Sequence, residues 1–374
     1  MSKVYRLMED IRNDVEEQIE RNGYVAMQKK YNFVQHLANG YWSDNKLCLN
    51  CANRKKSNNH AIPRFMLNAI SIKGMVSNSN ALIDAHFIKK ENGLAEAGAF
   101  SLLCNKCDQR LFKAYENPNN YEDEPNLVML AQISLKNYLK RISIRRKSLP
   151  LIAAMAYQQL DLEYGDFRNA PRHIIDYRVS KITAINRCET LYTEYSFAKL
   201  REHMMTNTLQ KPYLFYHCKV DYVTPIAFQS QVRLFYDFNG DIINNPSEQD
   251  NEQIEVLHIC IFPLQSSTVI MMYSDLLSKK DSYAIFKASF EELDDCGKLC
   301  LINFLVFKYS DEYFIHKDFM DILSKNEELI KIAKEMDAFY PDDIINMEAH
   351  KNSFSLSGMK KIPNLLAPNN ALKT

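Results

Sequence analysis

The sequence has few glycines and lacks the motifs by which glycine-rich loops bind nucleotide phosphates. Only nine of its 374 residues are glycine, and neither G-x-x-x-x-G-K-[ST] nor G-x-G-x-x-G occurs. The sequence therefore gives little support to nucleotide hydrolysis as its function.

Long apolar runs are absent as well. The sequence contains no run of 18 uncharged apolar residues, the length that would suggest a bilayer-spanning helix, and the first residues, Met-Ser-Lys-Val-Tyr, do not have the pattern of a secretory signal. Four of the nine cysteines form two close pairs and the other five are scattered, which favours reduced thiols over a disulfide framework. We therefore expect a cytoplasmic protein with no membrane partner.

The chain also has no net charge, since 46 basic residues balance 46 acidic ones. The charge is nevertheless uneven, because eleven basic and five acidic residues lie between Lys46 and Glu116. A further six basic residues and no acidic ones lie between Lys136 and Lys147. Such local concentrations attract polyanions through phosphate neutralisation. For the second cluster, a solvated helix face is an equally good interpretation.

Two Cys-x-x-Cys pairs are the strongest pattern in the sequence. A short turn lets both sulfurs of a pair bind one ion, and four thiolates in two pairs are the ligand set of a closed tetrahedral zinc site. We therefore predict one structural zinc, and the alternative is four unrelated buried cysteines. The predicted ligands are Cys48, Cys51, Cys104 and Cys107.

The residues between and after the pairs carry a family resemblance. They read S-x-x-H-x-I-P from Ser57 to Pro63, L-x-x-I-x-x-x-G-x-V from Leu67 to Val76, and C-D-x-x-L-F-x-x-x-E from Cys107 to Glu116. Together with the cysteine pairs, this order resembles the zinc-bearing members of the HNH (His-Me finger) endonuclease superfamily. It is also similar to bacterial defence-type proteins of uncharacterised function. The resemblance covers the segment from Cys48 to Glu116.

The resemblance implies a hairpin and a helix that hold one catalytic cation, Mg²⁺ or Mn²⁺. It assigns His60 as the general base, and Asp108 and Asn59 as ligands of that cation. A neutral imidazole suits proton abstraction because its ordinary pKa of about 6.5 lies near physiological pH. Alternatively, His60 is a zinc ligand or a structural histidine, and Asp108 is a helix N-cap.

Two residues depart from the family pattern, and a third matches it at an unexpected distance. Asn59 stands where the family has an acidic residue or histidine, and Asp108 stands where asparagine or histidine is common. Glu116 matches the motif, but eight residues of helix would place it about 12 Å beyond Asp108. Both carboxylates can reach one ion only if the helix ends between them, so we interpret Glu116 as a residue that positions the helix.

Arg64 and Arg110 are the expected phosphate contacts, because a guanidinium group binds phosphate through two hydrogen bonds. The leading hypothesis is a metal-dependent endonuclease that cleaves nucleic acid, with DNA expected over RNA, and that acts in anti-phage defence. The alternative is a non-catalytic, zinc-stabilised module that binds nucleic acid or protein. A protein partner or a second copy of the chain would bind through the N-terminal helices or the β-rich domain.

The chain as a whole reads as an α+β protein. We expect a treble-clef or ββα-metal zinc module, then a helical region, then a C-terminal antiparallel sheet with covering helices. Apolar steps of three and four predict helices in the first part, and runs of alternating β-branched and aromatic residues predict about four strands later. The expected units are N-terminal helices at 1–45, the zinc module at 46–118, the helical region at 126–210, the β-rich domain at 211–340 and a tail at 341–374.

Overall fold

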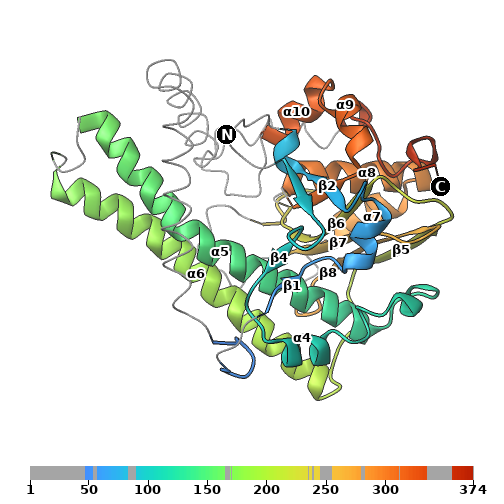
Figure 1. Cartoon of the computed structure of the whole chain (residues 1–374), viewed down its shortest axis with the longest axis horizontal. Coiled ribbons are helices and arrows are strands. Elements are labelled where there is room, and N and C mark those ends of the chain that lie inside the picture. The colour runs from blue at the N-terminus through green and yellow to red at the C-terminus, as the bar shows by residue number, and fades with distance from the viewer. Residues whose placement is uncertain are drawn as a thin grey trace.

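The structure, a computed structural model, describes residues 47–373 apart from 54–56, 83–89, 165–168, 170, 235, 238–239, 245–254, 279–282, 311 and 335–355. Its body is a layered α+β assembly from which two long helices project (Figure 1). The expected helices at 1–45 lie outside the described residues, as does the first part of the expected tail, 341–355. Among the helices that are described, none combines the length and apolar character needed to span a bilayer.

Seven antiparallel strands form the main sheet, in the order β3-β2-β9-β6-β7-β8-β5. Its longest-paired part is the hairpin of β7 and β8, which pair along their full length and are closed by the backbone hydrogen bond from Leu264 N to Ser267 O (2.8 Å). The strands are β2 (Met75–Asn78), β3 (Glu91–Gly93), β5 (Phe215–Val220), β6 (Ile226–Val232), β7 (Leu257–Pro263), β8 (Thr268–Ser274) and β9 (Tyr313–Ile315).

Both faces of this sheet are buried. Because side chains alternate along a strand, Ile259 and Ile261 of β7 enter one core while Cys260 and Phe262 enter the other. The first core is completed by helices from the C-terminal third of the chain. These are α7 (Ala284–Glu291), α8 (Asp295–Tyr309), α9 (Met320–Leu323), α10 (Glu327–Lys334) and α12 (Leu356–Met359).

The other face of the sheet is covered by a long helical pair. Helix α5 (Leu127–Tyr164) packs along α6 (Arg172–Met205), and the two extend together away from the sheet (Figure 1). The Asn126 side chain accepts a hydrogen bond from Met129 N (3.0 Å) at the start of α5. From Met129 to Leu139 this helix is buried on every side, between the sheet and the cysteine-bearing segment.

The cysteine-bearing segment forms a small unit with its own pattern of strands and helix. Strand β1 (Asn59–His60) pairs antiparallel with β4 (Ala99–Phe100), and α4 (Asn105–Leu111) follows directly. Between β1 and β4 the chain forms α3 (Arg64–Ala69) and then β2 and β3, which belong to the main sheet. The segment 46–118 and the segment 211–340 are thus joined through one sheet.

The mixed α+β fold class is confirmed, and the four expected strands correspond to β5–β8. The sequence has two helical patterns on either side of Ser148, and the structure joins them in one continuous helix, α5, which runs through Pro150. Apolar residues alternate from Ala81 to Phe87, a pattern that predicts a strand over 78–90, but Ser79–Ala81 is a 3-10 turn capped by the Asn78 side chain, and residues 83–89 are not described. The strand that is present there, β2, lies just before it.

Candidate functional site: a four-cysteine cluster beside a buried ion network

The four cysteines of the two pairs converge in space. The sulfur atoms of Cys48, Cys51, Cys104 and Cys107 all lie within 4.8 Å of one another, and all but Cys51 are buried. Each cysteine is free of disulfide bonds. Four sulfurs at this spacing, in two turns, are consistent with a structural zinc ion, whose Zn–S bonds are about 2.3 Å long. The coarse prediction of a zinc site is therefore supported by geometry.

The two turns that carry the cysteines are fastened to each other by backbone. Leu49 N donates to Leu102 O (2.9 Å), and Ser57 N donates to Leu103 O (2.9 Å). The side chain of Asn50 donates to Cys107 Sγ (3.1 Å) and accepts from Arg201 of α6. The cluster is thereby linked by hydrogen bonds both to the segment around β1 and β4 and to the long helical pair.

The environment of the sulfurs differs from one to another. Burial alone raises the pKa of Cys48, but hydrogen bonds involving the backbone at Cys104, Cys51 and Asn50 lower it to about 7. Burial, reinforced by hydrogen bonding with the other three thiols, raises the pKa of Cys107 to about 12. A central cation is what allows all four groups to be thiolates at once.

His60 ends the short strand β1 next to this cluster. Its Nδ1 lies 3.3 Å from the carbonyl oxygen of Ala97, and its side chain is partly exposed. Burial lowers the pKa of His60 below its ordinary value of 6.5, and the charges of Arg64 and Lys136 lower it further, while the Ala97 carbonyl and Asp108 oppose them. Three charged side chains therefore lie close enough to act on the imidazole.

Asp108 and Glu116 both contact one buried lysine. The Nζ atom of Lys136 lies 2.8 Å from Asp108 Oδ1 and 3.0 Å from Glu116 Oε1. They reach the same atom because α4 ends at Leu111, so the chain turns back before Glu116. The prediction that these carboxylates would be separated along a continuous helix is wrong for this reason.

The backbone around Glu116 is held from α5 and from the sheet. Tyr115 N donates to Gln132 Oε1 (2.7 Å), and the buried Tyr115 hydroxyl lies 2.5 Å from both Ala61 O and Gln229 Oε1. Since Ala61 directly follows His60, this one hydroxyl connects the histidine strand, the carboxylate segment and strand β6. Burial raises the pKa of Tyr115 well above its ordinary value, so the hydroxyl stays a donor.

The Asn59 side chain is held in place by hydrogen bonds. Its side chain is buried, and its Oδ1 accepts from Leu102 N (3.2 Å) and Leu103 N (2.9 Å) just before the second cysteine pair. Its Nδ2 donates to Ser57 Oγ (3.3 Å). The oxygen that was predicted to bind a catalytic cation is therefore engaged by two backbone donors.

The two predicted phosphate contacts lie on different sides of the unit. Arg64 is exposed at the start of α3 and acts electrostatically on His60. Arg110 is exposed on α4, two residues from Asp108, and two residues correspond to about 200° of helix rotation. Arg110 instead lies one turn from the exposed Lys106 and close to the exposed Lys113. The structure brings Arg64, but not Arg110, to the His60 side.

Lys136 belongs to the basic cluster that the sequence presents at 136–147, and the residues of this cluster whose side chains are described are buried or half-buried. Lys136 and Arg145 are buried. Lys140 pairs with Glu312 (3.2 Å), and Arg146 pairs with Glu194. Neither a solvated helix face nor a polyanion-binding surface describes these residues.

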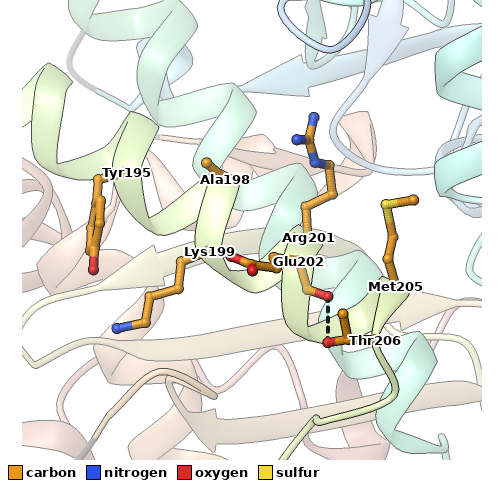
Figure 2. Close-up of a pocket in the computed structure, with 7 residues that line it drawn as sticks. All are labelled: Tyr195, Ala198, Lys199, Arg201, Glu202, Met205 and Thr206. Atoms are coloured by element: carbon orange, nitrogen blue, oxygen red, sulfur yellow. Dashed lines mark hydrogen bonds between the residues drawn. The ribbon is translucent and has the colours of Figure 1, made fainter.

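A separate surface pocket of about 430 Å³ lies along the end of α6 (Figure 2). In Figure 2 the Tyr195 and Lys199 side chains lie on one side and Met205 on the other, while Arg201 points away toward the cysteine side. Thr206 Oγ1 donates to the carbonyl of Glu202 (2.9 Å) and closes the helix. Tyr195 and Met205 are 59% and 70% exposed, so this end of α6 is an apolar surface within the described part of the chain.

Comparison with known proteins identifies no relative: no family model, no curated protein and no solved structure matches the chain. Lys136 is the site residue that the sequence analysis did not single out. The sequence carries no signal for this role, because Lys136 reads there as one residue of a basic cluster.

Proposed function

We propose that the protein is a metal-dependent endonuclease of HNH type that hydrolyses phosphodiester bonds in nucleic acid. The observation that carries the proposal is the order β1–β4–α4, with His60 on the first strand, Asp108 on the helix and a cysteine pair at the helix start.

In the proposed reaction His60 is the general base. When Nδ1–H donates to Ala97 O, the other ring nitrogen, Nε2, carries the lone pair, and it has no hydrogen-bond partner among the described residues. The lowered pKa keeps the imidazole neutral at physiological pH. Nε2 would then take the proton of the attacking water.

Asp108 and Glu116 would hold the catalytic cation. Carboxylate oxygens suit Mg²⁺ and Mn²⁺, and each of these side chains has one oxygen that does not contact Lys136. When bound, such an ion supplies Lewis-acid stabilisation of the leaving oxygen. Arg64 would neutralise the phosphate next to His60, since it is exposed on that side.

The exposed basic side chains of Lys106, Arg110 and Lys113 would bind the nucleic-acid backbone further from the scissile bond. These contacts do not read sequence, so we propose DNA as the substrate class on the family resemblance alone. The same resemblance places the activity in defence against phage or mobile DNA.

The test is plasmid cleavage by the full chain in Mg²⁺, Mn²⁺ or Ni²⁺. His60→Ala should reduce cleavage by about 10²–10⁴-fold. His203→Ala is the matched control, because His203 is a partly exposed histidine on α6 whose Nδ1 contacts Thr208 (2.8 Å). Zinc content and circular dichroism would show that both variants are folded. If the wild-type protein cleaves neither DNA nor RNA in any of these ions, the proposal fails.

One observation favours the second function, a non-catalytic zinc-stabilised binding module. Asn59 Oδ1 is saturated by backbone donors, and Lys136 already neutralises part of the carboxylate charge. A module of this kind would bind nucleic acid or protein without cleaving it. Binding of a DNA duplex without cleavage in any divalent ion would be its signature.

A further inference from the structure

Lys136 lies on the buried side of the two carboxylates, Asp108 and Glu116. The Lys136 side chain is fully buried, whereas the side chains of Asp108 and Glu116 are 15% and 35% exposed. The ammonium group therefore lies behind the two carboxylates as seen from solvent. The carboxylates, in turn, lie between the ammonium and the outside.

Aromatic rings close the site around the ammonium. Lys136 Nζ lies 4.2 Å from the ring centroid of Phe112 and 6.0 Å from that of Phe100. A cation at such a distance is attracted by the face of the ring. Phe100 pairs with Asn59 where β1 and β4 form their two-stranded sheet, so the residue before His60 and this ring are neighbours in that sheet.

The pair of carboxylates needs a cation at this place. Asp108 and Glu116 come from different parts of the chain, one on α4 and one after it, and both bind the same Nζ. Like charges at such short separation repel strongly when they are partly buried. Without the ammonium or another cation in its place, the two side chains would not stay together at this spacing.

We propose that Lys136 is a positioning residue of the nuclease site: its ammonium holds Asp108 and Glu116 together from behind, so that their outer oxygens bind one divalent cation beside His60. This inference rests on the proposed function, since it assigns the same carboxylates to the catalytic ion. The ammonium fixes where the divalent ion binds and lowers the affinity of the site for it, because the two cations repel each other.

A simple structural ion pair makes a different prediction. If Lys136 only stabilised the fold, removing its charge would weaken metal binding and cleavage together, along with the fold. If Lys136 positions the carboxylates, removing its charge leaves two uncompensated carboxylates that bind a divalent ion more tightly. Cleavage at saturating metal would nevertheless fall, because the ion would no longer be held beside His60.

The experiment is a Mn²⁺ titration of the zinc-loaded full chain, followed by electron paramagnetic resonance of free Mn²⁺. Lys136→Met keeps the volume of the stem and removes the charge. It should bind Mn²⁺ at least about tenfold more tightly than wild type, while its cleavage rate at saturating Mn²⁺ falls by at least about tenfold. Lys140→Met is the matched control, because Lys140 lies one turn further along α5 and pairs with Glu312 instead.

A second pair of variants avoids leaving two buried charges unpaired. In Glu116→Gln the lysine still faces Asp108, and in Lys136→Met/Glu116→Gln only the single carboxylate of Asp108 remains. The double variant should bind Mn²⁺ at least about tenfold more tightly than Glu116→Gln. This comparison decides the matter if Lys136→Met alone loses zinc or its circular dichroism spectrum.

The outcomes separate the two proposals. If wild type binds Mn²⁺ and cleaves, but neither lysine variant binds Mn²⁺ more tightly, the role of Lys136 is refuted and the proposed function stands. If wild type binds Mn²⁺ and the lysine variants gain affinity, but nothing cleaves, the positioning role stands and the nuclease proposal fails. If wild type does not bind Mn²⁺, both fail.

Discussion

Removal of the ion from the four-cysteine cluster should loosen one half of this protein and leave the other half folded. The free energy of zinc binding to a small structural site is about 10–16 kcal/mol, which is as large as the whole stability of a typical domain. Loss of the ion therefore leaves little to hold the two cysteine turns together. How far the damage spreads depends on which core each element enters.

The two cores of the structure predict where unfolding stops. The cysteine-bearing segment shares its core with α5 and one face of the sheet, and residues such as Leu103 and Tyr115 are buried in that core. The opposite face of the sheet packs on α8. Among the described residues of the cysteine-bearing segment, only Leu82, which follows the 3-10 turn Ser79–Ala81, enters that core. We therefore expect α4 and the two-stranded sheet of β1 and β4 to unfold while β7, β8 and α8 stay folded.

Hydrogen exchange of the protein with and without a zinc chelator would measure this. Exchange should rise across 57–72 and 99–121 and stay slow across 257–263, 268–274 and 299–309. Cys51→Ser should reproduce the effect of the chelator, and Cys296→Ser is the matched control, because both cysteines are exposed but only Cys51 belongs to the cluster. Uniform exchange over the whole chain, or no change at all, would refute the reasoning.

Three further results are expected. Tyr115→Phe removes the hydroxyl that contacts both Ala61 O and Gln229 Oε1, and it should lower the free energy of unfolding by about 1–3 kcal/mol in urea titrations. An unchanged midpoint would contradict the assigned contacts. Because the pKa of His60 is lowered, the acid limb of the cleavage profile should lie below pH 6.5, and a limb above that pH would argue against His60 as the base. Burial alone would raise the pKa of Asp275, but interactions with His258 and the Tyr138 hydroxyl lower it below 3.8 in the folded state. The stability that wild type gains over Asp275→Asn should therefore be complete above pH 3.8 and shrink as the pH falls further, and an advantage that disappears near neutral pH would contradict this.

Local patterns predicted the parts of the site that lie close to the cysteines. The spacing of the two pairs was enough to infer that the sulfurs converge, because a tetrahedral ion leaves no other arrangement. The motif around His60 and Asp108 predicted a strand and a helix, and both are present as β1 and α4. These inferences needed no knowledge of the rest of the chain.

Contacts across long sequence distances could not be predicted in the same way. Lys136 reads as one residue of a basic cluster, and only the packed structure shows that its stem enters the core and its ammonium meets two carboxylates. The end of α4 at Leu111 could not be predicted either, because the helical pattern of the sequence continues past it. In the structure the Gln132 side chain accepts a hydrogen bond from the backbone N–H of Tyr115. Tertiary contacts decide both features.

Anomalous diffraction from a crystal grown with Zn²⁺ and soaked in Mn²⁺ tests the central claim most directly. Data at the zinc edge should show one peak among the sulfurs of Cys48, Cys51, Cys104 and Cys107. Data that isolate manganese should show a second peak within coordinating distance of Asp108 and Glu116, on the side that faces His60. A manganese peak elsewhere, or a zinc peak without any manganese site, would contradict the account.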